Sequence, residues 1–134
     1  RKYPHSKELI RNIVTECEKR NAGKMLTAVD ADGNVHASSY FVYDEKVCYY
    51  LISGSSPEFR SSGAQTLILW EGIQSASKVS KAFDFEGSMI EGIEGFFRAF
   101  GGELIVNYEI RKQSFGGELY DILKPRVKRL IGYK

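Results

Sequence analysis

The sequence predicts an α/β (α+β) fold, in which a mixed sheet begins as an antiparallel meander, continues through a βαβ crossover and carries helices on both faces. Three observations support this prediction. Three apolar segments are separated only by short polar turns, as in a meander. A helical pattern and a further short apolar segment follow, as in a crossover between parallel strands. Another helical pattern precedes the meander.

The meander is expected after a helix at residues 6–21, where apolar residues recur at helical spacing and Gly23 gives the stop. We expect its strands at residues 25–30, 35–43 and 47–52. The first turn, with the sequence Asp-Gly-Asn, tolerates positive φ. Because the third strand is almost continuously apolar, it should lie inside the sheet rather than at its edge.

Six further elements are expected after the meander. They are a loop at residues 53–62, a helix at 63–78, a strand at 82–85, a helix at 88–100, a strand at 104–111 and a last helix at 118–131. Ser88 and Glu91 form the S-x-x-E pattern of a capping box, which marks a helix start. Gly101 and Gly102 then end that helix in the manner of a glycine C-cap.

The composition fits one ordinary globular domain. Of the 134 residues, 43% are hydrophobic and 27% are charged, which excludes a disordered acidic chain. No run of 18 apolar residues occurs, so we expect no transmembrane segment and a cytoplasmic protein. Cys17 and Cys48 form no CxxC pair and are expected to be buried, reduced thiols. The two histidines, His5 and His36, lack ligand spacing, so no metal site is predicted.

The most informative stretch joins the third strand to the following helix. The first N–H groups of a helix have no partner within it, and the helix dipole favours an anion such as pyrophosphate at that end. Gly63 and Ala64 allow a ligand to approach the backbone, and Arg60 offers a charged contact to a phosphate. Alternatively, the stretch is only a capped helix start, with Ser61 or Ser62 as the N-cap.

This stretch resembles a segment of the GNAT acyltransferases. Residues 60–63, Arg-Ser-Ser-Gly, match the start of their R/Q-x-x-G-x-G/A segment, which binds the pyrophosphate of acyl-CoA. Gln65 stands where that segment has Gly or Ala. A longer resemblance, to the Fem-related transferases, is carried by five segments in the same order and spacing. They are residues 49–54 (YYLISG), 59–64 (FRSSGA), 69–71 (LWE), 83–88 (FDFEGS) and 95–101 (GFFRAFG).

The resemblance implies an acyl- or aminoacyl-transferase. Such enzymes transfer an acyl group from acyl-CoA or aminoacyl-tRNA to an amine, and Fem-related members build peptidoglycan cross-bridges in bacteria. No tightly bound cofactor is implied, because the donor is a substrate, and tRNA would be a partner as its carrier. The resemblance also implies that residues 1–134 are one GNAT-like domain, the C-terminal half of a two-domain protein whose N-terminal domain is its partner.

The resemblance also suggests where the parts of a site lie. The sheet of this fold splays after the strand at residues 47–52, so exposed groups near Ser53 and Gly54 would hold the donor arm. N-acyl transfer also needs a base near the amine. Asp84 and Glu86 stand at the end of the neighbouring strand, where sites in open sheets usually lie. They alternate with phenylalanines and should therefore share one face.

The candidate residues fall into three groups. They are Ser53, Gly54, Arg60, Ser61, Ser62, Gly63 and Ala64 for the donor, Asp84 and Glu86 for catalysis, and Arg98 for the substrate. Plainer alternatives are that Asp84 pairs with a structural cation, that Glu86 is only solvated and that Arg98 is a surface residue. Two other functions also stay open: a non-catalytic GNAT-like scaffold, which Gln65 favours, and a tRNA-binding module that uses the basic segment at residues 124–134.

Overall fold

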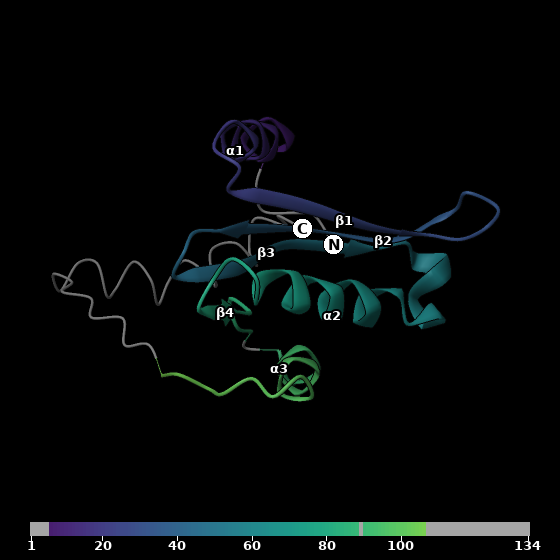
Figure 1. Ribbon diagram of the computed structural model, residues 1–134. Coiled ribbons are helices and arrows are strands. Elements are labelled where there is room, and N and C mark those ends of the chain that lie inside the picture. The colour runs from purple at the N-terminus through teal and green to yellow at the C-terminus, as the bar shows by residue number, and fades with distance from the viewer. Residues whose placement is uncertain (1–5, 89, 107–134) are drawn as a thin grey trace, which may run out of the picture. The chain divides into compact units, whose positions relative to one another are not determined.

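The computed structural model describes residues 6–88 and 90–106 (Figure 1). The elements are α1 (Lys7–Lys19), β1 (Gly23–Val29), β2 (Val35–Tyr43), β3 (Val47–Ser55), the 3-10 helix η1 (Pro57–Ser62), α2 (Ala64–Ala76), β4 (Ala82–Asp84) and α3 (Glu91–Arg98). The chain divides into two compact units, Arg1–Leu104 and Ile105–Lys134, and all these elements lie in the first. The predicted helix at residues 118–131 and the basic segment at 124–134 lie outside the described residues. That residues 1–134 form one domain stays a prediction.

The sheet has four strands in the order β1-β2-β3-β4. Strands β1 and β2 pair antiparallel, as do β2 and β3, whereas β3 and β4 are parallel. The meander, the crossover and the internal position of the third strand are therefore confirmed. Helix α2 forms the long connection that two parallel neighbours require.

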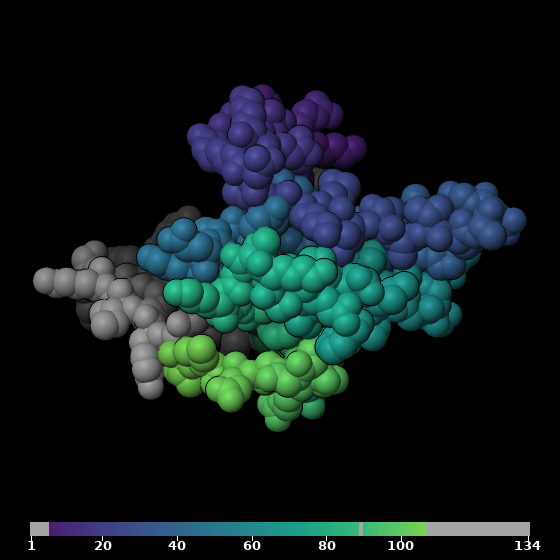
Figure 2. All heavy atoms as spheres, viewed as in Figure 1, coloured from purple at the N-terminus to yellow at the C-terminus, as the bar shows by residue number. Residues whose placement is uncertain are grey.

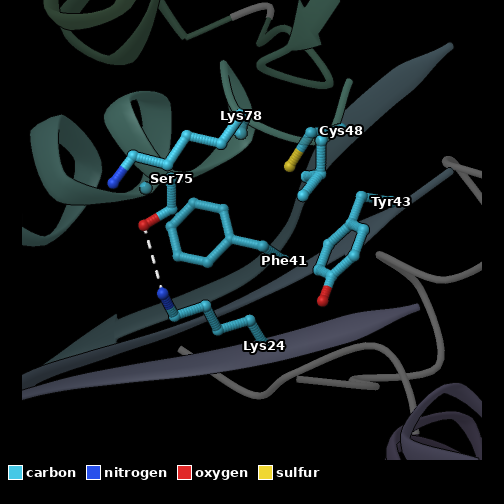
Figure 3. Close-up of a pocket in the computed structure, with 9 residues that line it drawn as sticks. Lys24, Phe41, Tyr43, Cys48, Ser75 and Lys78 are labelled. Carbon is cyan, nitrogen blue, oxygen red and sulfur yellow. Dashed lines mark hydrogen bonds between the residues drawn. The ribbon is translucent and has the colours of Figure 1, made fainter. Parts of the chain in front are cut away.

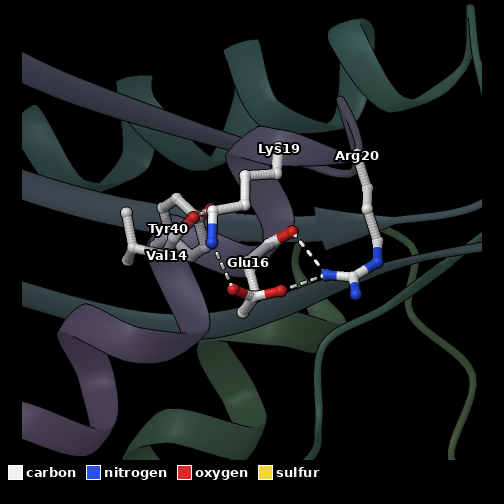
Figure 4. A network of polar contacts seen from close by, with 5 residues as sticks. All are labelled: Val14, Glu16, Lys19, Arg20 and Tyr40. Atoms are coloured by element: carbon white, nitrogen blue, oxygen red, sulfur yellow. Dashed lines mark hydrogen bonds and ion pairs between the residues drawn. The ribbon is translucent and has the colours of Figure 1, made fainter.

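Helices cover both faces of this sheet, as predicted (Figure 1). Tyr40 and Phe41, which are neighbours on β2, serve opposite faces. On the side of α1, the Tyr40 hydroxyl donates to the Val14 carbonyl at 3.4 Å (Figure 4). On the side of α2, Phe41 belongs to the main hydrophobic core. The core consists of Ala37, Phe41, Cys48, Tyr50, Ala64, Ile68, Leu69 and Ala76.

Helix α1 begins after Ser6, whose hydroxyl accepts the N–H of Leu9 at 3.1 Å. Near its end, the Glu16 carboxylate accepts from Lys19 Nζ at 2.7 Å and from Arg20 Nη1 at 2.7 Å (Figure 4). These bonds, that from Lys19 first, lower the pKa of Glu16 below its ordinary value. Since no α1 residue is fully buried, the helix stands out as a separate purple group of atoms in Figure 2.

The prediction of a loop at residues 53–62 is wrong. Strand β3 continues to Ser55, because β2 supplies pairing partners as far as Ala37, which lies opposite Ser55. The small residues of this stretch suit an extended strand when a partner is present. Pro57 then begins η1, where its fixed φ and its missing N–H are tolerated.

Later elements also differ from the predictions. Strand β4 ends one residue early, at Asp84. Helix α3 begins at Glu91 rather than Ser88, since the Ser88 hydroxyl accepts the N–H of Ile90 at 3.1 Å and forms a local turn instead of a capping box. Residues 104–106, the described part of the strand predicted at 104–111, are not in a strand.

Candidate functional site

The candidate site follows the place where β3 and β4 part. The last pair of their ladder joins Tyr49 to Asp84, and β3 then continues alone on that side to Ser55. At ~3.3 Å per residue, the free edge is about 20 Å long. In the described part of the chain no strand covers it, so N–H and C=O groups along the edge can bind a ligand. Ser53 and Gly54 lie near its far end.

The far end of this edge leads through η1 to the start of α2. Gly63 joins the two helices at φ +75°, in the left-handed region that favours glycine. A Cβ added at Gly63 or at Gly54 would meet no atom within 4 Å, so a ligand can approach the backbone at both positions. Arg60 is exposed in the last turn of η1 and stands ready to contact such a ligand.

The start of α2 differs in detail from the alternative of a capped helix. Its N-cap is Gly63 rather than Ser61 or Ser62. The Ser62 hydroxyl nevertheless accepts the N–H of Ala64 at 3.3 Å, which satisfies one of the first N–H groups. Ser61 and Ser62 are both exposed. The anion seat predicted from the sequence is therefore an open helix start with a serine partner at its first N–H group.

Gln65 turns inward, toward the sheet. Its Nε2 donates to Ser39 Oγ at 3.0 Å and to the Tyr50 hydroxyl. Ser39 is only 2% exposed, and this bond supplies a partner for its buried hydroxyl. The side chain that departs from the Gly or Ala of the GNAT segment therefore leaves the outer side of the helix start unobstructed. Sequence reasoning missed this contact, because nothing in the sequence indicates that Ser39 faces α2.

Asp84 and Glu86 lie at the near end of the free edge, and both are exposed. Because β4 ends at Asp84, strand alternation does not place the two carboxylates on one face. Instead, Asp84 Oδ1 accepts the N–H of Glu86 at 2.7 Å, and Glu86 adopts φ +60° in a tight turn. No ion pair involves Asp84 within residues 6–88 and 90–106. The structural cation proposed as its partner is thus not found among these residues.

Aromatic side chains fix the turn that carries these carboxylates. The ring of Phe85, which lies between them in sequence, stacks on Phe97 of α3 with centroids 5.1 Å apart. Phe97 in turn packs perpendicular to the ring of Tyr50, with centroids 6.0 Å apart, at the start of the free edge of β3. The phenylalanines of α3 therefore pack against the core, and the turn is anchored to the strand that it borders.

The candidate residues form two groups along one strand edge rather than one cluster. Asp84 lies opposite Tyr49, and Ser53 is about 13 Å further along β3 at ~3.3 Å per residue. An extended ligand is needed to touch both groups. Arg98 joins neither, since both of its described polar contacts are with Glu94 Oε1, at 2.6 and 3.0 Å. Its position matches the surface alternative.

A cavity of about 230 Å³ lies elsewhere, at the opposite end of α2 from Gly63 (Figure 3). It is lined by Lys24, Phe41, Tyr43, Cys48, Gly72, Ser75, Ala76, Lys78 and Val79. Two of these residues are bonded to each other, since Lys24 Nζ donates to Ser75 Oγ at 3.1 Å. Burial raises the pKa of the Cys48 thiol, another of these residues, to about 11. None of the candidate donor, catalytic or substrate residues lines this cavity, so it is separate from the candidate site.

In the part of the chain that the structure describes, no three His, Cys, Asp or Glu side chains come together in a way that would hold a metal ion. Among the same residues, no helix has the length and apolar character needed to cross a membrane.

Comparison with known proteins gives a family match and similar folds. The model of the family described as "Acetyltransferase (GNAT) domain" matches residues 1–92, more than half of the chain. No curated protein matches. Among solved structures, AAC(6')-Iy in complex with the bisubstrate analogue CoA-S-monomethyl-acetylneamine is similar, with a TM-score of 0.65 and 14% identity. The similarity covers 83% of this chain and 82% of that one.

Two other solved structures extend this similarity. The aminoglycoside 6'-N-acetyltransferase AAC(6')-IG from Acinetobacter haemolyticus has a TM-score of 0.62 and 14% identity, over 84% of this chain and 86% of that one. An acetyltransferase from Trypanosoma brucei has a TM-score of 0.60 and 16% identity, over 84% and 82%. At these identities the likeness concerns the fold alone.

Proposed function

Because this chain belongs to the GNAT acetyltransferase family, we propose that it transfers an acyl group from a thioester carrier to an amine. The observation that carries the proposal is the free edge of β3, which joins an open helix start at Gly63 to two exposed carboxylates at Asp84 and Glu86. An extended acyl-CoA would place its phosphates at the first group and its thioester toward the second. The bisubstrate analogue in AAC(6')-Iy contains the CoA moiety that such a path would hold.

Each end of the edge has a distinct chemical part. At the Gly63 end, backbone N–H groups and the helix dipole favour phosphate, and the Arg60 guanidinium adds charge-assisted hydrogen bonds. Along the edge, strand N–H and C=O groups pair with the amides of the carrier arm. At the other end, Asp84 or Glu86 takes a proton from the amine. As the amine nitrogen bonds to the carbonyl carbon, the C–S bond breaks, and the proton held by the carboxyl group passes to the leaving thiolate, so that the carrier departs as a thiol.

A second donor, aminoacyl-tRNA, is favoured by the segments that resemble Fem-related transferases. Two of these segments flank the free edge: residues 59–64 lie beyond its far end, in η1 and at the start of α2, and residues 83–88 begin at the end of β4. With this donor the broken bond is a C–O ester bond, and the tRNA carrier is the partner. On this reading the chain is the C-terminal half of a cytoplasmic, two-domain enzyme of bacterial peptidoglycan synthesis.

Titration calorimetry with CoA and acetyl-CoA tests the thioester donor. We expect binding to the wild type and a loss of about tenfold or more for Arg60→Ala, the usual effect of removing a charged hydrogen bond. Arg11→Ala, an exposed arginine on α1, is the matched control and should bind like the wild type. Equal weakening by both variants would show only non-specific attraction of the anion.

The two donors are separated by a parallel titration with aminoacyl-tRNA. Binding that falls steeply with salt, together with no heat from CoA, favours the tRNA carrier. Release of free thiol from acetyl-CoA in the presence of amines tests the transfer itself, and Asp84→Asn and Glu86→Gln should slow it. If neither donor binds, the proposal of acyl transfer by this chain is abandoned.

A further inference from the structure

A histidine of β2 sits beside the proposed donor segment in an unusual backbone position. Ala28 of β1 lies opposite Ala37, and the next residue, Val29, lies opposite Val35. His36 is therefore an extra residue in β2, the mark of a β-bulge. Bulges redirect a side chain that regular alternation would send elsewhere, and they are frequent next to active sites.

The redirected ring of His36 is held by two contacts. It stacks on the ring of Phe59 with centroids 4.0 Å apart and planes only 3° from parallel. Its Nε2 lies 3.1 Å from Asp30 Oδ2. Hydrogen bonds, above all that from the Asn34 side chain, lower the pKa of Asp30 to about 2. Asp30 is therefore a carboxylate at neutral pH, so Nε2 carries the hydrogen and donates it.

These contacts join the sheet to η1. Phe59 lies in the middle of η1, directly before Arg60, and departs from helical geometry at φ −109° and ψ 18°. No residue of η1 is fully buried, so the core does not hold this short helix. Its described attachments to β2 are the stack on His36 and the bond from the Ser56 N–H to the His36 carbonyl, at 2.9 Å.

We infer that His36 is a positioning residue of the proposed donor site, which fixes η1 by its stack on Phe59 and is itself oriented by Asp30. The inference rests on the proposed function for its consequence, because it is Arg60 and Gly63, at the end of η1, that would contact the donor. The His36 side chain is only 18% exposed, and it is both stacked on Phe59 and bonded to Asp30. These contacts hold it in one orientation. The fixed His36 ring therefore holds Phe59 in place, so η1 is already ordered when the donor binds.

Amide hydrogen exchange of residues 58–63 in the unliganded chain tests the positioning step without any donor. His36→Ala removes the platform and should make this exchange about tenfold faster, since local opening then costs less. Phe59→Ala should do the same. His36→Phe keeps a stacking ring but loses the bond to Asp30, and its exchange should stay within about threefold of the wild type.

Tyr40→Phe is the control for general destabilisation, because it removes a hydrogen bond on the opposite face of the sheet. It should leave the exchange of residues 58–63 unchanged. Unchanged exchange in His36→Ala would overturn the inference. So would exchange in His36→Phe as fast as in His36→Ala, or an equal acceleration by Tyr40→Phe.

Calorimetry with CoA then tests the link to the donor. His36→Ala should bind CoA about tenfold more weakly, because the ligand must now order η1 as it binds, and His36→Phe should recover most of the affinity. Wild-type affinity in His36→Ala would overturn the link. If the wild type itself fails to bind CoA while the exchange pattern is as expected, the thioester donor fails and the positioning of η1 by His36 stands.

Discussion

Gly72 of α2 lies directly against the ring of Phe41 on β2. A Cβ placed on Gly72 would lie 2.3 Å from Phe41 Cζ and 2.4 Å from Cε1, much closer than atoms can approach. The distance between α2 and the sheet is therefore set by the missing side chain. Since α2 also carries the Gly63 end of the candidate site, this contact determines where the helix start stands relative to β3.

Gly72→Ala should accordingly destabilise the protein. Overpacking costs about 1–3 kcal/mol, which exceeds the gain of about 1 kcal/mol from replacing glycine in a helix. Gly95→Ala in α3 is the matched control, because its Cβ would meet nothing within 4 Å, and it should be neutral or stabilising. Urea unfolding measures both. A Gly72→Ala variant as stable as the wild type would contradict the contact.

Gln65 should matter for stability more than an ordinary residue of a first helical turn. Gln65→Leu leaves the hydroxyl of Ser39 without its partner inside the protein, at an expected cost of about 1–3 kcal/mol. In a Ser39→Ala background the same change should cost less, because the stranded hydroxyl is gone. A double-mutant cycle by urea unfolding measures the coupling, and strictly additive effects would mean that the bond contributes nothing.

Asp30 should give the protein a specific sensitivity to acid. Its pKa is about 2 in the folded chain and ordinarily about 3.9 when unfolded. A lowered pKa stabilises the fold above pH 4, and that contribution disappears as the pH falls from about 4 to about 2. The stability difference between the wild type and Asp30→Asn should shrink over this window. Asp32→Asn, at a neighbouring carboxylate that makes no hydrogen bond in the described part of the chain, is the matched control.

Cys48 should be inert in the folded protein. Burial raises the pKa of its thiol to about 11, so only about a thousandth of it is thiolate at pH 8. Cys17 is only partly buried and should react first with iodoacetamide. Mass spectrometry of the labelled peptides, with a urea-unfolded sample as reference, measures the order. Equal labelling of both cysteines in the native chain would contradict the burial of Cys48.

The left-handed backbone conformation of Glu86 should destabilise the fold. A residue other than glycine at φ +60° costs about 1–2 kcal/mol, part of which glycine recovers despite its greater freedom when unfolded. Glu86→Gly should therefore stabilise the fold by about 0.5–1 kcal/mol, whereas Glu86→Gln should be nearly neutral. If Glu86 serves as the base, both should slow thiol release. A destabilised Glu86→Gly would show that the carboxylate has a structural role.

The sequence predicted the meander well, because alternation and turn chemistry are local properties. In the first turn, for example, the Asp30 carboxylate accepts the N–H groups of Asp32 and Asn34, so the residues of the turn themselves determine its conformation. The end of β3 was missed for the opposite reason. Residues 53–55 are small and polar, and they form a strand only because β2 lies beside them.

The candidate site divides in the same way. Gly63, the N-cap of α2, and Arg60 in η1 were proposed from their order in the sequence, since an open helix start needs only neighbours along the chain, and their role stays a prediction. Gln65, Ser39 and Tyr50 were not connected, because their contacts join residues that only the folded sheet brings together. The prediction that Asp84 and Glu86 share one face of a strand extended alternation past the true end of β4, where Glu86 lies in a turn.

The parallel pairing of β3 and β4 also has a consequence for the order of folding. Strands β1, β2 and β3 meet across short hairpins, whereas Val47 meets Ala82 only after the whole of α2 has been traversed. Bringing two strands together across a long segment costs chain entropy before any contact between them forms, and this makes their pairing slow. We therefore expect the hairpins to assemble early and β4 to join last, so that the fork between β3 and β4 arises in the closing stage of folding.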